Sequence, residues 1–134
     1  MAGYSGTPLP KKLGIKDGYR VALVDAPADV KTDLRDAIAG CRAAKEAPLD
    51  YVHLFAKSRA DFQKQLKQWS KTLAPAGMIW VSWPKKSSGV TTDLTEDIIR
   101  EIGLAAGLVD IKVCAVTDVW SGLKFVIPVK NRPR

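Results

Sequence analysis

The residues with the clearest chemical potential form a short basic loop between an apolar segment and a helix-like segment. The loop reads Lys85-Lys86-Ser87-Ser88-Gly89. Backbone N–H groups of a Ser/Gly loop can surround an anion, and two lysines add positive charge. The spacing of a Walker-type loop is absent, and the acids Asp93, Glu96 and Asp97 that follow would repel an anion. Two interpretations stay open: an anion-binding loop, and a mobile connection with solvated lysines.

Two further residues could contact a ligand. Asp25 directly follows an apolar segment, where its carboxylate could bind a ribose or an amine. The alternative is an aspartate that only stabilises a turn or caps a helix. Trp120 precedes Ser121-Gly122 in a predicted hairpin turn, where an exposed indole could contact a ligand or a partner. Trp120 could equally fold back over the sheet and cover the core.

The sequence predicts no catalytic residue, cofactor or metal site. His53 is the single histidine and lies within an apolar segment, which favours a hydrogen-bonded core residue over a general base. Cys41 and Cys114 are the two cysteines, and no Cys-x-x-Cys pair is present to suggest zinc. No Ser-His-Asp or Cys-His arrangement follows from the spacing. The residues therefore favour a protein without catalytic activity and leave an enzyme open as the alternative.

The elements that must position these residues alternate between strand-like and helix-like segments. Short apolar runs bounded by Gly, Pro or Asp predict strands over residues 19–24, 50–55, 78–83, 109–116 and 123–129. Apolar residues at helical spacing predict helices over residues 30–39, 59–73 and 93–106, and residues 8–13 fit one helical turn closed by Gly14. Residues 118–122 indicate a hairpin turn. Residues 41–49 could continue a helix or form a loop.

This order predicts a three-layer α/β domain. Strands that alternate with helices indicate a mostly parallel sheet, here of five strands, with helices on both faces and a C-terminal antiparallel hairpin. Ligands of such sheets bind outside the carboxyl ends of the strands, where Asp25 and the loop at 85–89 would meet. We expect one domain over residues 1–134, with loose tails at about 1–7 and 130–134.

The positive charge of the chain is concentrated in its middle. The formal net charge is +7, and residues 51–90 hold seven basic residues against one acid, Asp61. Lys64, Lys67 and Lys71 recur at helical spacing and predict a basic helix face. A basic surface attracts phosphates or acidic partners, whereas nucleic-acid binding would also need a groove-fitting element or interleaved aromatic residues. An anionic small molecule is therefore the expected partner, and nucleic acid is not favoured.

No apolar run is long enough to span a bilayer, and the N-terminal residues lack the apolar core of a signal peptide. We therefore expect a cytoplasmic protein without a membrane partner. An edge strand of the predicted sheet could pair between subunits, so a monomer and a homodimer both stay open.

Several phrases of the sequence resemble class I methyltransferases. GIKDGYRVALVD is similar to the entry into the first strand of that fold, DYVHLF to its fourth strand, and LAPAGMIWVSW to the turn and fifth strand. The resemblance implies a truncated methyltransferase-like (Rossmann-like) fold that lacks the second and third strands. It also implies a glycine-rich loop for S-adenosylmethionine after the first strand. The residues at that place, 25–29, contain no glycine.

Longer phrases resemble a small bacterial family known only as a domain of unknown function. They are PLPKKLGIKDG, WVSWPKKSSGVTTDLTEDIIRE and GLVDIKVCAVTDVWSGLKFVI, and the resemblance covers nearly the whole chain. It implies no activity. The function expected from the residues is ligand binding or regulation at the sheet edge formed by Asp25, the loop at 85–89 and Trp120. The alternatives are a methyltransferase-like enzyme acting on a nucleotide-like or anionic substrate, and a nucleic-acid or protein interaction module.

Overall fold

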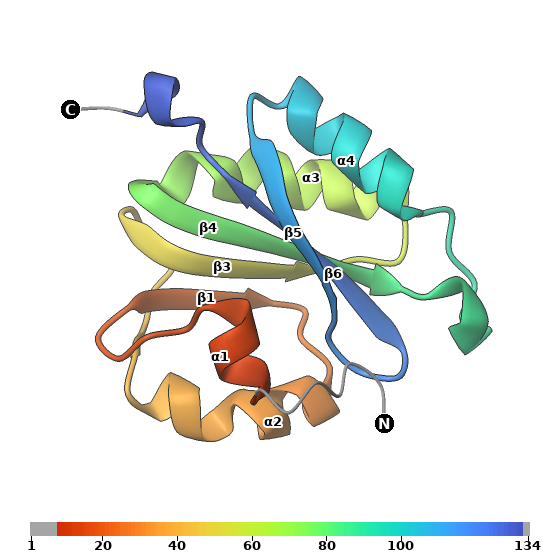
Figure 1. The fold of residues 1–134 in the computed structure, drawn as a ribbon, viewed down its shortest axis with the longest axis horizontal. Helices are drawn as coiled ribbons and strands as arrows, with labels where there is room; N and C mark the ends of the chain where they lie inside the picture. Colours follow the sequence, from red (N-terminus) through yellow and green to blue (C-terminus); the bar gives the residue numbers. More distant parts are fainter. Residues whose placement is uncertain (1–7, 133–134) are drawn as a thin grey trace.

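Six strands of the described residues form one mixed sheet in the order β2-β1-β3-β4-β6-β5, with helices on both faces (Figure 1). The computed structural model describes residues 8–132. The strands are β1 (Arg20–Val24), β2 (Arg42–Ala43), β3 (Leu49–Phe55), β4 (Leu73–Pro84), β5 (Val109–Ala115) and β6 (Trp120–Val126). The α-helices are α1 (Leu9–Leu13), α2 (Ala28–Ala39), α3 (Arg59–Trp69) and α4 (Glu96–Ala105). Short 3-10 turns are η1 (Ser70–Thr72), η2 (Lys86–Ser88) and η3 (Val129–Asn131).

The pairing of the strands confirms the predicted α/β class and the C-terminal hairpin. Strands β1 to β4 pair in parallel, whereas β6 runs antiparallel to β4 and β5 antiparallel to β6. The prediction of five strands was wrong by one, because β2 was not predicted. Strand β2 is two exposed residues long, so it carries no apolar alternation. It is recognised only by its pairing with β1, where the carbonyls of Val21 and of Tyr19, the residue before the strand, accept from the N–H groups of Ala44 (3.0 Å) and Arg42 (2.8 Å).

The sheet buries a separate apolar cluster on each face. On one face, Leu13 of α1 and Leu34 of α2 pack against Tyr51 and Trp80 of the central strands. On the other face, Phe62 of α3 and the helix α4 pack against the odd-numbered positions of β4 and β6. Strand β4 is fully buried from Met78 to Pro84, as its continuous apolar run predicts. Figure 1 shows α1 and α2 on one side of the sheet and α3 and α4 on the other.

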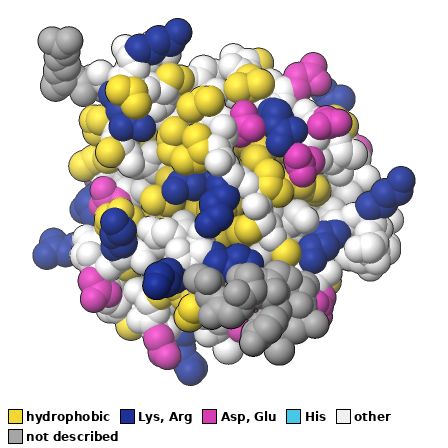
Figure 2. All heavy atoms as spheres, in the orientation of Figure 1, with side chains coloured by type: hydrophobic (Ala, Val, Ile, Leu, Met, Phe, Trp, Pro, Cys, Tyr) yellow, Lys and Arg dark blue, Asp and Glu magenta, His cyan; other side chains and the backbone are white. Residues whose placement is uncertain are grey.

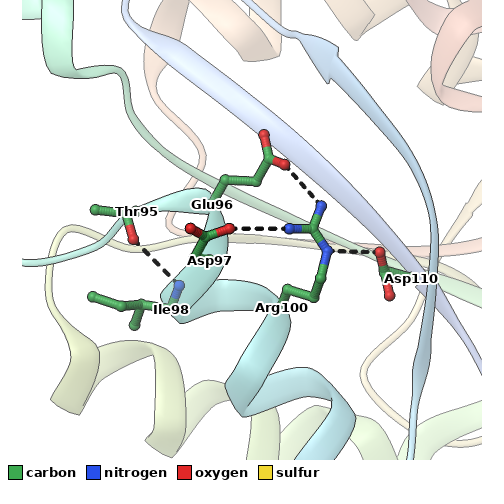
Figure 3. A network of polar contacts seen from close by, with 6 residues as sticks. All are labelled: Thr95, Glu96, Asp97, Ile98, Arg100 and Asp110. Atoms are coloured by element: carbon green, nitrogen blue, oxygen red, sulfur yellow. Dashed lines mark hydrogen bonds and ion pairs between the residues drawn. The ribbon is translucent and has the colours of Figure 1, made fainter.

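Helix α4 begins later than its acidic residues predict. Thr95 caps the helix, because its side-chain oxygen accepts from the N–H of Ile98 at 3.2 Å (Figure 3). Asp93 lies outside the helix, and its carboxylate accepts from the N–H of Arg59 at 2.8 Å. The predicted start at Asp93 was therefore wrong, since that carboxylate satisfies the first turn of α3 instead.

Arg100 of α4 pairs with three carboxylates, of which Asp110 lies on β5 and thereby joins the helix to that strand (Figure 3). Its guanidinium donates to Asp110 at 2.8 Å, to Glu96 at 2.8 Å and to Asp97 at 3.4 Å. The hydrogen bond from Arg100 lowers the pKa of Asp110, and the same bond raises the pKa of Arg100. Two of the three acids expected to repel an anion near the start of α4 are thus paired with Arg100.

Strand β6 begins earlier than predicted, at Trp120. The hairpin turn therefore spans residues 116–119 rather than 118–122. Trp120 is 7% exposed, so the interpretation that it covers the core holds and the one that leaves it exposed does not.

At the ends of the chain, the predicted tail at 1–7 lies outside the described residues, as do residues 133–134. Lys130 and Asn131, predicted as part of the other tail, belong to η3. Within residues 8–132, no helix has the length and apolar character needed to cross a membrane.

Candidate functional site

A cleft of about 490 Å³ opens where β1 and β3 end and where α2 and α3 begin. Val24 and Leu54 are register partners in these parallel strands, so Asp25 and Phe55 leave the sheet side by side. The residues that give the cleft its chemistry are Asp25, Phe55, Lys57, Asp61, Val90 and Trp120. The cleft therefore lies at the carboxyl ends of the strands, where ligands of open α/β sheets bind.

Asp25, an exposed residue directly after β1, has a backbone conformation that few residues adopt. Its φ is +59°, in the left-handed region, where aspartate and asparagine are the most tolerated residues after glycine. One carboxylate oxygen, Oδ2, accepts from Gln65 Nε2 at 3.1 Å. The same nitrogen donates to the carbonyl oxygen of Phe55 at 3.1 Å. Gln65 of α3 thus fixes the ends of β1 and β3 relative to each other.

The other half of the Gln65 amide carries an unsatisfied group. Gln65 is 9% exposed, and its Oε1 is a buried side-chain oxygen without a hydrogen-bond partner among the described residues. Such an acceptor is costly to leave unpaired in a protein interior. It belongs to the same planar amide whose nitrogen bonds Asp25 and Phe55, two residues of the cleft.

Two aromatic residues form the apolar wall of the cleft. The rings of Phe55 and Trp120 meet edge to face, with centroids 5.4 Å apart and planes at 79°. On its other side, Phe55 stacks on His53 with centroids 4.3 Å apart and planes at 17°. Ring packing on both sides holds Phe55 in one orientation, so the wall is preformed.

Charged residues occupy the mouth of the cleft. Lys57 follows β3, and Asp61 lies in the first turn of α3, which Ser58 caps by accepting from the Asp61 N–H at 3.1 Å. Both Lys57 and Asp61 are exposed. With Asp25, the lining carries two carboxylates and one ammonium. The cleft is therefore richer in hydrogen-bond acceptors than in donors.

The basic loop at 85–89 does not line this cleft, and only Val90 represents that segment there. The loop forms η2 and uses its polar groups internally. The Ser88 hydroxyl donates to the Lys85 carbonyl at 2.6 Å and accepts from the Val90 N–H at 3.2 Å. The Lys85 N–H donates to the Val119 carbonyl at 2.7 Å. The loop thus fixes Val119 beside Trp120, while several of the N–H groups expected to surround an anion are already bonded.

His53 lies beneath the cleft in a fully buried polar chain. Its Nδ1 is 2.9 Å from the Tyr51 hydroxyl, and its Nε2 is 2.7 Å from the Ser82 hydroxyl. All three side chains are 0% exposed, and burial lowers the pKa of His53 to about 3. The prediction of a hydrogen-bonded core histidine is confirmed. A neutral imidazole can accept from one hydroxyl and donate to the other, so each tautomer satisfies the chain.

Of the residues predicted for the site, the structure brings Asp25 and Trp120 into one cleft and places the loop at 85–89 outside its lining. Sequence reasoning missed Gln65 as the residue that holds Asp25. A signal was present, because Gln65 interrupts the apolar stripe of α3 between Phe62 and Leu66. A polar residue within a buried stripe has a specific partner.

Other chemistry is sparse among residues 8–132. No group of three or more His, Cys, Asp or Glu is arranged to hold a metal ion there. Burial raises the pKa of both thiols, Cys41 and Cys114, which keeps them protonated. Lys64, Lys67 and Lys71 are exposed around the end of α3, as the helix-face interpretation requires.

Comparisons with known proteins agree on the fold. A family model described as "Protein of unknown function (DUF3052)" matches residues 10–129. No match was found among proteins with curated descriptions. A SAM-dependent methyltransferase from Aquifex aeolicus is similar in structure, with a TM-score of 0.61, 13% identity, and coverage of 90% of this chain and 88% of the other.

Two fibrillarins are also similar in structure. The Aeropyrum pernix protein, solved with natively bound S-adenosyl-L-methionine, has a TM-score of 0.55 and 13% identity, with coverage of 85% of this chain and 69% of the other. The Methanococcus jannaschii pre-rRNA processing protein has a TM-score of 0.48 and 16% identity over 80% of this chain, which spans 55% of that protein. At such identities the Aquifex and Aeropyrum matches show a methyltransferase-like fold, and nothing about activity.

Proposed function

We propose that this chain, which belongs to the protein family of unknown function DUF3052, binds a small nucleoside-like molecule in its cleft. The ligand would be bound without being transformed. The observation that carries the proposal is the meeting of Asp25 with an aromatic wall at the carboxyl ends of β1 and β3. A ligand suited to this cleft has hydroxyl or amine donors on one side and a flat apolar ring on the other.

The donors are needed because the polar groups of the cleft are mostly acceptors. Asp25 has one oxygen held by Gln65, which leaves Oδ1 to accept from a ligand. Asp61 supplies the second carboxylate of the lining. Vicinal hydroxyls of a ribose, or an amine, present two donors at short spacing. Both choices match the chemistry expected of a carboxylate at the end of the first strand.

The flat ring is needed because Phe55 and Trp120 supply a rigid aromatic surface. The fold supports the same ligand class, since the Aeropyrum pernix fibrillarin of similar fold holds S-adenosyl-L-methionine. The absence of a glycine from residues 25–29 favours binding over methyl transfer. The backbone at Asp25 nevertheless takes the left-handed conformation that a glycine would adopt easily.

We expect Asp25→Asn to weaken the binding of adenosine, S-adenosylmethionine and S-adenosylhomocysteine by about tenfold or more, because a charge-assisted hydrogen bond is lost. Asparagine tolerates the positive φ and can still accept from Gln65, so the fold stays intact. The measurement is a calorimetric titration of each probe, preceded by a thermal-shift screen. Asp33→Asn, which removes an exposed charge from α2 outside the cleft, is the matched control and should bind like the wild type.

Two results would overturn this proposal. One is that none of the three probes raises the melting temperature or gives heat of binding with the wild-type protein. The other is that Asp25→Asn and Asp33→Asn weaken binding equally, which would assign the effect to net charge.

A second candidate is methyl transfer, favoured by the likeness of the fold to the SAM-dependent methyltransferase from Aquifex aeolicus. It predicts that S-adenosylmethionine is converted to S-adenosylhomocysteine when a methyl acceptor is added. Incubation with labelled S-adenosylmethionine and a panel of small-molecule and RNA acceptors separates the two functions. Turnover that Asp25→Asn abolishes would replace binding by catalysis as the function of the cleft.

A further inference from the structure

Four lysines that are far apart in the sequence converge on the face of the sheet that carries α1. Lys112 of β5 and Lys124 of β6 are register partners in adjacent strands. Lys112 Nζ donates to the backbone carbonyl of Lys12, at the end of α1, at 2.9 Å. Lys124 Nζ lies 3.8 Å from the position that a Cβ on Gly14 would occupy. Figure 2 shows Lys and Arg side chains gathered at the centre of this face, over α1 and the crossing of β5 and β6.

The turn after α1 adds the fourth lysine. Lys16 acts electrostatically on Lys124, whose pKa is lowered by burial first and then by Lys112 and Lys16. Lys12 and Lys112 act in the same way on the thiol of Cys114. We define Lys12, Lys16, Lys112 and Lys124 as the lysine cluster. Its members come from one helix, one turn and two strands, so the fold itself assembles them.

Lys16, Lys112 and Lys124 repel one another. Like charges directly opposite each other on neighbouring strands destabilise a sheet, and Lys112 and Lys124 are such a pair. The salt bridges found in residues 8–132 all belong to Arg100, on the opposite face. Lys16, Lys112 and Lys124 thus form no salt bridge with an acidic residue among residues 8–132. An anion placed among the ammonium groups would remove this repulsion.

We propose that the lysine cluster binds a phosphate group, carried either by a small phosphorylated molecule or by a nucleic-acid backbone. Phosphate fits because it brings more than one negative charge and several acceptor oxygens to ammonium groups that are point-charge donors. The site is distinct from the cleft, with which it shares no residue. It is also a better anion site than the loop at 85–89, where bonds within the chain already occupy several N–H groups.

The test uses a pair of double variants with the same loss of charge. Lys16→Met with Lys124→Met removes two ammonium groups of the cluster but keeps the apolar stems and leaves Lys112 bonded to α1. Lys64→Met with Lys67→Met removes two exposed charges from α3 and is the control. At low salt we expect the cluster variant to bind pyrophosphate about tenfold more weakly than the wild type, and the control less than twofold. A short single-stranded RNA is titrated in parallel to identify the source of the phosphate.

The outcomes decide the proposal without ambiguity. If the cluster variant loses binding of pyrophosphate but not of RNA, and the control keeps both, the result supports a small phosphorylated ligand. If the cluster variant loses binding of both pyrophosphate and RNA, the result supports a nucleic-acid backbone. No binding of either probe by the wild type overturns the proposal, as does an equal loss in both variants. If the double variant does not fold, Lys16→Met alone serves, because Lys16 is exposed. An NMR titration of Lys124 adds a separate readout, since a bound phosphate should raise its pKa.

Discussion

Acidification from pH 7 to pH 5 is expected to lower the free energy of unfolding by about 2 kcal/mol through His53 alone. His53 is the single histidine, and no other type of side chain ordinarily titrates between these values. Its pKa in the folded protein is about 3, against 6.5 when exposed. Between these two values the unfolded chain binds a proton that the folded chain does not. The stabilisation is therefore complete above pH 6.5 and is lost as the pH falls towards 3.

The measurement is urea unfolding at several pH values between 7 and 5, for the wild type and for His53→Gln. Glutamine offers one donor and one acceptor to Tyr51 and Ser82 but cannot titrate. We expect the variant to be less stable at pH 7, because it loses the ring stack on Phe55, and to show almost no change between pH 7 and pH 5. An NMR titration of the His53 ring protons gives an independent reading, since the imidazole should remain neutral throughout this range.

Equal pH slopes in the two proteins would show that His53 is not the cause. So would ring protons that titrate near pH 6.5 in the folded state, because that result requires access of water to the imidazole. Either result would also weaken the description of the wall of the cleft, since His53 stacks on Phe55. A His53 that stays neutral instead supports the polar chain as a structural link between β3 and β4.

Sequence reasoning succeeded where a residue's environment depends on its neighbours along the chain. The burial of β4 follows from a continuous apolar run, and the position of Asp25 follows from its place directly after β1. Trp120 was placed in the cleft region by its hairpin, although the turn is shifted and the indole is buried. Strand β2 was missed because two exposed residues become a strand only through β1. Local pattern contains no information about such a pairing.

The site shows the same division between local and distant information. Asp25 could be assigned to a ligand edge from the sequence, but the residue that holds it, Gln65, lies 40 positions away. The loop at 85–89 was predicted as an anion site from its composition. The sequence did not show that the loop forms hydrogen bonds to Val119 and between its own residues. The lysine cluster could not be predicted from the sequence. Lys112 and Lys124 lie in a stretch where basic and acidic residues balance, and the two lysines approach α1 only in the folded chain.

Helix α4 packs against β6 through a glycine, Gly103, which no apolar pattern in the sequence identifies as a contact residue. The buried positions of α4 are Ile99 and Gly103, whereas Ala105 is exposed. A Cβ on Gly103 would overlap the ring of Phe125, which is 0% exposed and packed in the core of the sheet. The glycine therefore sets how closely α4 approaches β6.

Gly103→Ala is expected to destabilise the protein by roughly 2 kcal/mol, because overpacking a buried site commonly costs more than the ~1 kcal/mol gained from the better helix propensity of alanine. In a Phe125→Leu background, which vacates the ring positions, the same change should become neutral or stabilising. Urea unfolding of the four proteins gives the coupling between the two sites directly. Ala105→Gly measures the propensity contribution at the exposed last position of α4 and should cost less than the ~1 kcal/mol typical of a helix interior. Equal effects of Gly103→Ala in both backgrounds would mean that α4 shifts freely on the sheet, and that Gly103 does not set its distance from β6.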